Sequence, residues 1–161
     1  MEKEFYIIAH NIRSAYNVGS IFRTADGLGA KKIYLTGYTP YPADSEEFDI
    51  KKSRRMISKT ALGAEENVEW ERKEDIFKVI EKLKNEKFQI VALELNVKSQ
   101  DLKNFQPKFP CALILGNEVL GVDEKLLKLC DAIIKIPMQG KKESFNVSVA
   151  AGIAMYEILN K

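Results

Sequence analysis

The chain contains 161 residues, of which 45% are hydrophobic, 9% aromatic and 30% charged, a composition typical of a soluble globular protein that buries a core of its own. No apolar run approaches the roughly 18 residues that a membrane-spanning helix needs. The first residues, MEKEFYIIAHNIRS, lack the features of a signal peptide. We therefore expect a single cytoplasmic domain with no membrane span. The net charge of +2 is small, so nucleic-acid binding would require a local cluster of cations.

The cysteine and histidine content limits the kinds of site that this chain can form. The sequence contains two cysteines, Cys111 and Cys130, and one histidine, His10. These are too few for a disulfide framework or for a metal site built from thiols and imidazoles. We therefore expect a protein without a bound metal.

Short runs rich in Ile, Val, Leu and aromatic residues recur along the chain and are bounded by polar or turn residues, as is typical of buried strands. These predicted strands cover residues 5–9, 32–36, 89–95, 111–115 and 132–136, with a weaker sixth candidate at 68–70.

The segments between these runs show the apolar spacing of helices. The predicted helices cover residues 17–28, 74–86, 124–129 and 146–159, the third with Asp123 as its N-cap. In the second helix the residues expected to share the buried face are Ile76, Phe77, Ile80 and Leu83. No helix is assigned between residues 38 and 59, where a loop over 38–48 precedes a basic stretch over 51–59. The alternation of strands and helices predicts an α/β fold with a mainly parallel sheet.

The first informative motif is NVGSIFRTADGLG, residues 17–29. At roughly 100° per residue, Asn17 and Arg23 lie about 120° apart around a helix, so both can lie near one rim of a site without facing each other. The alternative is an ordinary amphipathic helix on which Arg23 is a solvated surface charge. Ile21 and Phe22 are expected in the core.

The second motif is LILGNEVLGV, residues 113–122, in which an apolar strand runs into Gly-Asn-Glu and a further glycine, Gly121. In open α/β sheets ligands bind beyond the carboxyl ends of strands, and glycines there let a ligand approach the backbone. The spacing fits neither G-x-G-x-x-G nor a P-loop, so the motif predicts a binding loop but not a dinucleotide or nucleoside triphosphate site. A plain strand-to-helix turn that places Glu118 at a helix entry is the alternative.

The third motif is IKIPMQGKKESFNVSVAAGIAMYEIL, residues 134–159. Ser144, Asn146 and Ser148 crowd the start of the predicted helix, where side-chain oxygens and free backbone N–H groups can orient a substrate or an anion. A role of Ser144 as a helix cap is an alternative that is compatible with a functional role.

These three motifs, in this order, resemble those of the SpoU (TrmH) branch of the SPOUT superfamily, and the resemblance extends from Ile8 to Leu159. Phe145 stands where leucine is common in that family. The resemblance implies a single domain over residues 1–161 with a Rossmann-like sheet. It also implies that roughly residues 111–161 form a deep trefoil knot, an exception to the rule against knotted chains. The implied activity is methylation of ribose 2′-hydroxyls in RNA, with S-adenosylmethionine as the methyl donor.

The resemblance also implies a role for individual positions. The residues implied to line the S-adenosylmethionine pocket are Leu93, Gly116, Ile136, Met138 and Phe145, and at position 116 a side chain would occupy cofactor volume. The residues that match the active-site positions are Asn17, Arg23, Glu118, Ser144 and Asn146. Arg23 is implied to activate the hydroxyl. In one alternative Arg23 acts as a base, which would require a strongly lowered pKa because arginine is normally protonated. In the other it clamps the substrate phosphate and lowers the pKa of the hydroxyl. The other four would orient the reactants by hydrogen bonds.

Contacts with RNA and with a second subunit are also expected. The cations predicted to contact RNA phosphates are Arg13, Lys51, Lys52, Arg54 and Arg55. A solvated helix face explains the run at 51–55 equally well. The resemblance implies a homodimer in which the last helix packs against its mate, and in which groups from the other subunit complete the site around Arg23.

The RNA target and two competing functions stay open at this point. The sequence shows no added RNA-binding domain of the kind that some family members carry, and this favours a compact tRNA over rRNA as the substrate. A non-catalytic RNA-binding module with the same fold is the main competing function. An enzyme that acts on a small molecule with a nucleotide cofactor is a weaker one, because the sequence has no phosphate-loop motif.

Overall fold

The computed structural model describes residues 2–161, in which a sheet of seven parallel strands has the order β3-β2-β1-β6-β4-β7-β5. The strands are β1 (Phe5–His10), β2 (Lys32–Thr36), β3 (Glu69–Lys73), β4 (Gln89–Leu93), β5 (Gln100–Asp101), β6 (Cys111–Leu115) and β7 (Ala132–Lys135). The five stronger strand predictions are confirmed, with ends shifted by at most two residues. The weak candidate at 68–70 overlaps the start of the edge strand β3, and the two-residue strand β5 was not predicted.

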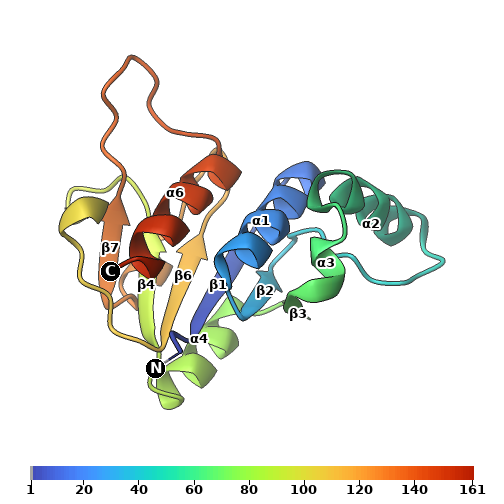
Figure 1. The fold of residues 1–161 in the computed structure, drawn as a ribbon, viewed down its shortest axis with the longest axis horizontal. Helices are drawn as coiled ribbons and strands as arrows, with labels where there is room; N and C mark the ends of the chain where they lie inside the picture. Colours follow the sequence, from blue (N-terminus) through green and yellow to red (C-terminus); the bar gives the residue numbers. More distant parts are fainter. Residues whose placement is uncertain (1) are drawn as a thin grey trace.

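Helices cover both faces of this sheet (Figure 1). They are α1 (Ala15–Leu28), α2 (Phe48–Ala61), α3 (Ala64–Asn67), α4 (Ile76–Asn85), α5 (Glu124–Leu127) and α6 (Val147–Leu159). One apolar core lies between the sheet and α1, α2, α3 and α6, and a second lies between the opposite face and α4 and α5. None of the helices formed by residues 2–161 combines the length and the apolar character needed to span a membrane.

One element was left unassigned in the sequence, and one expectation about local structure is wrong. The basic stretch 51–59 lies within the helix α2, which was not predicted because only Ile57 and Ala61 of that helix are buried, too few to produce a clear helical period. Phe77 is 47% exposed, and Val79 is buried in its place. Residues 76, 79, 80 and 83 share one helix face at i, i+3, i+4 and i+7, and position 77 points away from it.

Helices α1 and α2 cross closely at Gly19, a residue of the first motif. A Cβ atom at this position would lie 2.0 Å from Thr60 Oγ1 and 2.3 Å from the carbonyl oxygen of Ile57. The Thr60 hydroxyl donates a hydrogen bond of 2.7 Å to the carbonyl oxygen of Tyr16. The glycine is therefore required by helix packing, and this contact sets the position of α2 relative to α1.

The order of the strands places the candidate site. Strand β1 pairs with β2 on one side and with β6 on the other. The chain runs outward from β1 to β2 and β3, and then crosses to β4 on the far side of β6. Such a reversal leaves a crevice beyond the carboxyl ends of the neighbouring strands, which is where open α/β sheets bind ligands.

Candidate functional site

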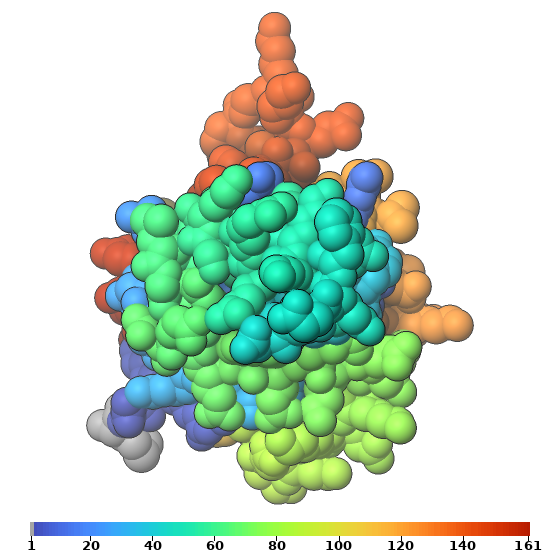
Figure 2. Space-filling view, turned by 90° about the vertical axis from the view of Figure 1, so that its right-hand side faces the viewer, coloured from blue at the N-terminus to red at the C-terminus, as the bar shows by residue number. Residues whose placement is uncertain are grey.

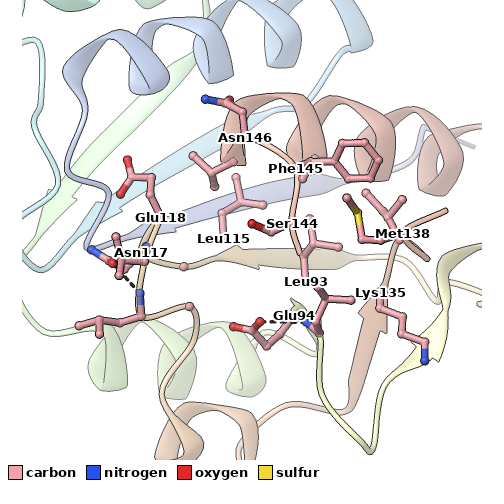
Figure 3. A pocket seen from close by; sticks show the side chains of 18 residues that line it. Leu93, Glu94, Leu115, Asn117, Glu118, Lys135, Met138, Ser144, Phe145 and Asn146 are labelled. Carbon is pink, nitrogen blue, oxygen red and sulfur yellow. Dashed lines mark hydrogen bonds between the residues drawn. The ribbon is translucent and has the colours of Figure 1, made fainter. Parts of the chain in front are cut away.

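A cavity of about 410 Å³ lies beyond the carboxyl ends of β4, β6 and β7, beside the start of α6 (Figure 3). Its volume is in the range of small-molecule sites. The residues predicted to hold the cofactor all line it, namely Leu93, Gly116, Ile136, Met138 and Phe145. Aliphatic side chains dominate this part of the wall, with Leu95, Leu115, Val147 and Ala150 beside the predicted set.

The packing of the protein's own loop gives Gly116 a requirement for glycine that was not predicted. A Cβ atom at position 116 would lie 2.5 Å from the carbonyl carbon and oxygen of Gly121 and 2.8 Å from Val122 Cγ2. A side chain would therefore collide with the protein's own loop before it reached the cavity. The glycine permits the close approach of two backbone segments that shape the pocket wall.

The loop from Asn117 to Gly121 is held by its own hydrogen bonds. The backbone groups of these two residues pair with each other at 2.9 and 3.1 Å, and Asn117 Oδ1 accepts the N–H groups of Val119 and Leu120, each at 2.8 Å. The Asn117 amide group donates to the carbonyl oxygen of Asn11 and to the hydroxyl of Tyr38. This stabilising role of Asn117 was not predicted, and two of its partners, Asn11 and Tyr38, are distant in sequence.

Glu118 is engaged by the start of α1. Its carboxylate accepts the backbone N–H groups of Arg13 at 2.9 Å and of Ser14 at 3.1 Å, and the side-chain amide of Asn17 at 3.2 Å. Burial raises the pKa of the Glu118 carboxyl, but these donors outweigh burial and hold the pKa below its ordinary value. The side chain is therefore an anionic anchor between two motifs and is a poor general base.

A chain of polar contacts links the three motifs, from Glu118 through Asn17 to Asn146. Asn17 donates to Glu118, and Asn17 Oδ1 accepts a hydrogen bond of 3.2 Å from the side chain of Asn146. Asn146 also caps α6, because its Oδ1 accepts the N–H groups of Ser148 and Val149. Ser144 lines the cavity and is not the helix cap, so that alternative is wrong.

Arg23 is separated from the other predicted active-site residues. Its side chain is exposed, does not line the cavity and makes no hydrogen bond or ion pair within residues 2–161. Arg23 lies on α1 about 1.7 turns beyond Asn17. Within one chain the fold brings four of the five residues together and leaves Arg23 exposed on α1.

The predicted RNA-contacting cations lie apart from the cavity. Helix α2 presents a shallow groove lined by Lys51, Arg54, Arg55, Ser58 and Lys59, on the face that Figure 2 shows. Ion pairs join Lys51 to Glu46 at 3.7 Å and Arg54 to Asp44 at 3.0 Å. The Arg13 side chain is exposed near the start of α1.

Neither a metal site nor a reactive cysteine is found among the described residues. No group of three or more His, Cys, Asp and Glu side chains that could hold a metal ion occurs in residues 2–161. Burial raises the pKa of the Cys111 thiol to about 12 and that of Cys130 to about 11, so neither is an ionised nucleophile near neutral pH.

Comparisons with known proteins agree with this geometry. Residues 4–156 match the model of the SpoU rRNA methylase family. A Bacillus subtilis protein assigned to the TrmH family of tRNA/rRNA methyltransferases is 32% identical over 99% of this chain and 60% of its own length. The tRNA (guanosine(18)-2′-O)-methyltransferase of Aquifex aeolicus is 31% identical over 97% of this chain and 69% of its own length.

A solved structure supports the same relationship. The AdoMet-bound rRNA methyltransferase from Sinorhizobium meliloti superposes with a TM-score of 0.78 and 26% identity, over 98% of this chain and 56% of that one. The present chain therefore spans somewhat more than half the length of these relatives. The family match over nearly the whole sequence shows that the chain belongs to the SpoU rRNA methylase family.

Proposed function

We propose that this protein transfers a methyl group from S-adenosylmethionine to a ribose 2′-hydroxyl of RNA. The observation that carries the proposal is the cavity itself, in which an aliphatic wall adjoins the polar chain of Glu118, Asn17 and Asn146. A tRNA is the favoured substrate and rRNA the alternative. The name of the A. aeolicus relative supports the 2′-hydroxyl of tRNA, and that of the S. meliloti relative supports rRNA.

The residues around the cavity fit S-adenosylmethionine. Leu93, Ile136, Met138 and Phe145 offer apolar contacts to an adenosine group, and backbone groups of the loops supply hydrogen-bond donors and acceptors. When bound, the sulfonium supplies a methyl group that is already activated for attack by an oxygen nucleophile. Ser144 and Asn146 orient the ribose hydroxyl, and Glu118 holds Asn17 in place.

Arg23 is proposed to act on the cavity of a second subunit. Helix α6 exposes Val149, Ile153 and Tyr156, which are 51%, 39% and 61% accessible and recur at helical spacing. An apolar stripe of this kind supports a homodimer that packs through α6. Because α1 packs against α6, such a dimer would carry the exposed Arg23 toward the partner. There it activates the hydroxyl as a base or clamps the adjoining phosphate.

The groove on α2 is proposed to bind RNA phosphates. Residues 51, 54, 55, 58 and 59 share one face because they are separated by three or four positions. The remaining predicted cations, Lys52 and Arg13, would contact phosphates outside the groove. The acidic partners of Lys51 and Arg54 are themselves exposed, so RNA phosphates can replace them at little cost.

We also infer that residues 1–161 form one domain and that roughly residues 111–161 are knotted. Support comes from strand order, because β7 enters the sheet between β4 and β5, which the chain has already joined through residues 94–99. The segment that follows β7 has to pass the β4–β5 connection, residues 94–99, before α6 packs against α1.

Transfer of labelled methyl from S-adenosylmethionine tests the proposed activity. The acceptors are total tRNA and, separately, rRNA from a strain that lacks the gene, followed by nucleoside analysis. A 2′-O-methylnucleoside in one pool is the expected result and names the substrate class. Cofactor binding without incorporation into either pool would instead indicate a non-catalytic RNA-binding module.

A further inference from the structure

Glu94 is a carboxylate in the cavity wall that the proposed mechanism does not use. It follows β4 directly and is partly buried. Its Oε2 accepts the backbone N–H of Val122 at 2.6 Å, and its Oε1 accepts the N–H of Leu95 at 2.9 Å. The side chain thereby bridges the end of β4 and the loop that follows β6, and both of its oxygens are fixed in place.

This carboxylate retains unused acceptor capacity. A carboxylate offers about four lone-pair sites, and these two hydrogen bonds occupy one site on each oxygen. No lysine or arginine of residues 2–161 forms an ion pair with Glu94. Lys135, the one cation of these residues that lines the cavity, is paired instead with Asp101 at 3.8 Å. Glu118, the other carboxylate of the cavity, is instead occupied by three donors from the start of α1. Glu94 is therefore the acidic side chain available to a ligand.

Gly121 allows the Glu94 carboxylate to occupy this position. Gly121 has a φ of +68°, and a Cβ atom there would lie 2.0 Å from Glu94 Oε2. Any side chain at position 121 would displace the carboxylate from its hydrogen bond with Val122. The second glycine of the motif thus serves Glu94 as well as the turn.

The position of Glu94 in the cavity indicates which hydrogen-bond donor of the proposed cofactor it can bind. S-adenosylmethionine offers a pair of ribose hydroxyls, an adenine amino group and an ammonium group. Methyl transfer requires the sulfonium to face the polar chain of Glu118 and Asn146, and Glu94 lies across the cavity from that chain, beside Leu93 (Figure 3). The aliphatic wall at Leu93 suits the adenine ring, and the ribose is bonded directly to that ring.

We propose that Glu94 binds both hydroxyls of the cofactor ribose, one on each carboxylate oxygen. Two charge-assisted hydrogen bonds to a fixed acceptor would then select the ribonucleoside and orient the sulfonium. An acidic residue at the end of a strand plays this part toward ribose in other α/β sheets. This inference rests on the proposed cofactor, and its test uses equilibrium binding without RNA or turnover.

The test compares three ligands by titration calorimetry: S-adenosylhomocysteine, its 2′,3′-dideoxy analogue and 5′-methylthioadenosine, which lacks the amino-acid portion. Wild-type protein should bind S-adenosylhomocysteine roughly 10- to 100-fold more tightly than the dideoxy analogue. Glu94→Gln should lose most of that preference and should weaken S-adenosylhomocysteine and 5′-methylthioadenosine by the same factor. Glu81→Gln, the same change at an exposed site on α4, should alter neither affinity.

Other outcomes would overturn the proposal. If Glu94→Gln weakened the dideoxy analogue as much as S-adenosylhomocysteine, Glu94 would only brace the loop at Val122. If it weakened S-adenosylhomocysteine but not 5′-methylthioadenosine, the carboxylate would recognise the ammonium group. A wild-type protein that did not discriminate against the dideoxy analogue would also refute the idea, whether or not the variant folds. Wild-type protein that binds none of the ligands would refute the proposed cofactor itself.

Discussion

At the scale of single residues, Glu118 shows how a motif side chain can serve the site without reacting. Its charge is held by two backbone N–H groups and the amide of Asn17, and Asn17 in turn meets Asn146. The anion therefore stabilises the arrangement of three motifs. Its pKa is lowered in the folded protein because these donors favour the charged form over the neutral one.

This arrangement predicts a pH-dependent effect of Glu118→Gln. Because the folded pKa of Glu118 is lowered, the stability contributed by its charge is complete above the ordinary glutamate pKa of about 4.5. It disappears as the pH falls through the lower folded value. Glu118→Gln should therefore lower the melting temperature at pH 7, and the gap from wild type should close in acid. Melting curves from pH 7 down to pH 3 check this, and a gap independent of pH would contradict it.

At the scale of secondary-structure elements, the contact between α1 and α2 gives a matched pair of predictions. Gly19→Ala places a methyl group within 2.0 Å of Thr60 Oγ1 and 2.3 Å of the backbone of Ile57, and should destabilise the protein by about 1–3 kcal/mol. Gly27→Ala lies on the same helix with nothing within 4 Å, and should stabilise it by up to about 1 kcal/mol. Urea unfolding of both variants measures these free energies. Equal effects at the two sites would show that backbone entropy, rather than the contact with α2, decides the result.

The proposed role of α2 can be tested through salt dependence. Arg55→Ala with Lys59→Ala removes two groove cations that form no ion pair within residues 2–161, and leaves Lys51 and Arg54 in place. If both contact phosphates, the slope of log affinity for tRNA against log salt concentration should fall in magnitude by roughly 1.4 to 1.8. Lys78→Ala with Lys84→Ala on α4 is the control and should leave the slope unchanged. Fluorescence anisotropy over a KCl series provides the measurement. An unaltered slope in the α2 variant would mean that this face is only solvated.

At the scale of the whole molecule, the separation of Arg23 from the cavity predicts complementation between subunits. Arg23→Ala should abolish turnover but retain cofactor affinity, and Ile136→Arg should fill the cavity and prevent cofactor binding. Random mixing of the two inactive proteins should restore roughly a quarter of wild-type turnover, because half of the dimers are mixed and each carries one intact site. If Arg23 serves its own chain, the mixture stays inactive.

The same dimer predicts a dependence on α6. Ile153→Glu places a charge within the stripe formed with Val149 and Tyr156, and should shift the protein to monomers in sedimentation experiments. Turnover should fall with dissociation while S-adenosylhomocysteine affinity is retained. A stable dimer that carries this substitution would locate the interface elsewhere.

The sequence alone was enough to predict the main strands, most of the cavity wall and one helix cap. The strands were predictable because a strand buried on both faces is a continuous apolar run, which needs no knowledge of its neighbours. The second and third motifs also contain most residues of the cavity wall, since they follow strands or begin a helix, and carboxyl ends of parallel strands meet at one edge. Asp123 was predictable as a cap because capping depends on contacts within a single turn.

Other features were decided only by the tertiary structure. Helix α2 buries too few side chains to show a period, and its position depends on the contact of Gly19 with Thr60. The need for glycine at position 116 comes from the backbone at Gly121, and the bonding of Glu118 comes from the distant start of α1. Glu94 carries no local signal, because its partner Val122 becomes a neighbour only when two loops meet. A sequence records which groups are present, whereas packing between distant segments decides which of them remain free to bind a ligand.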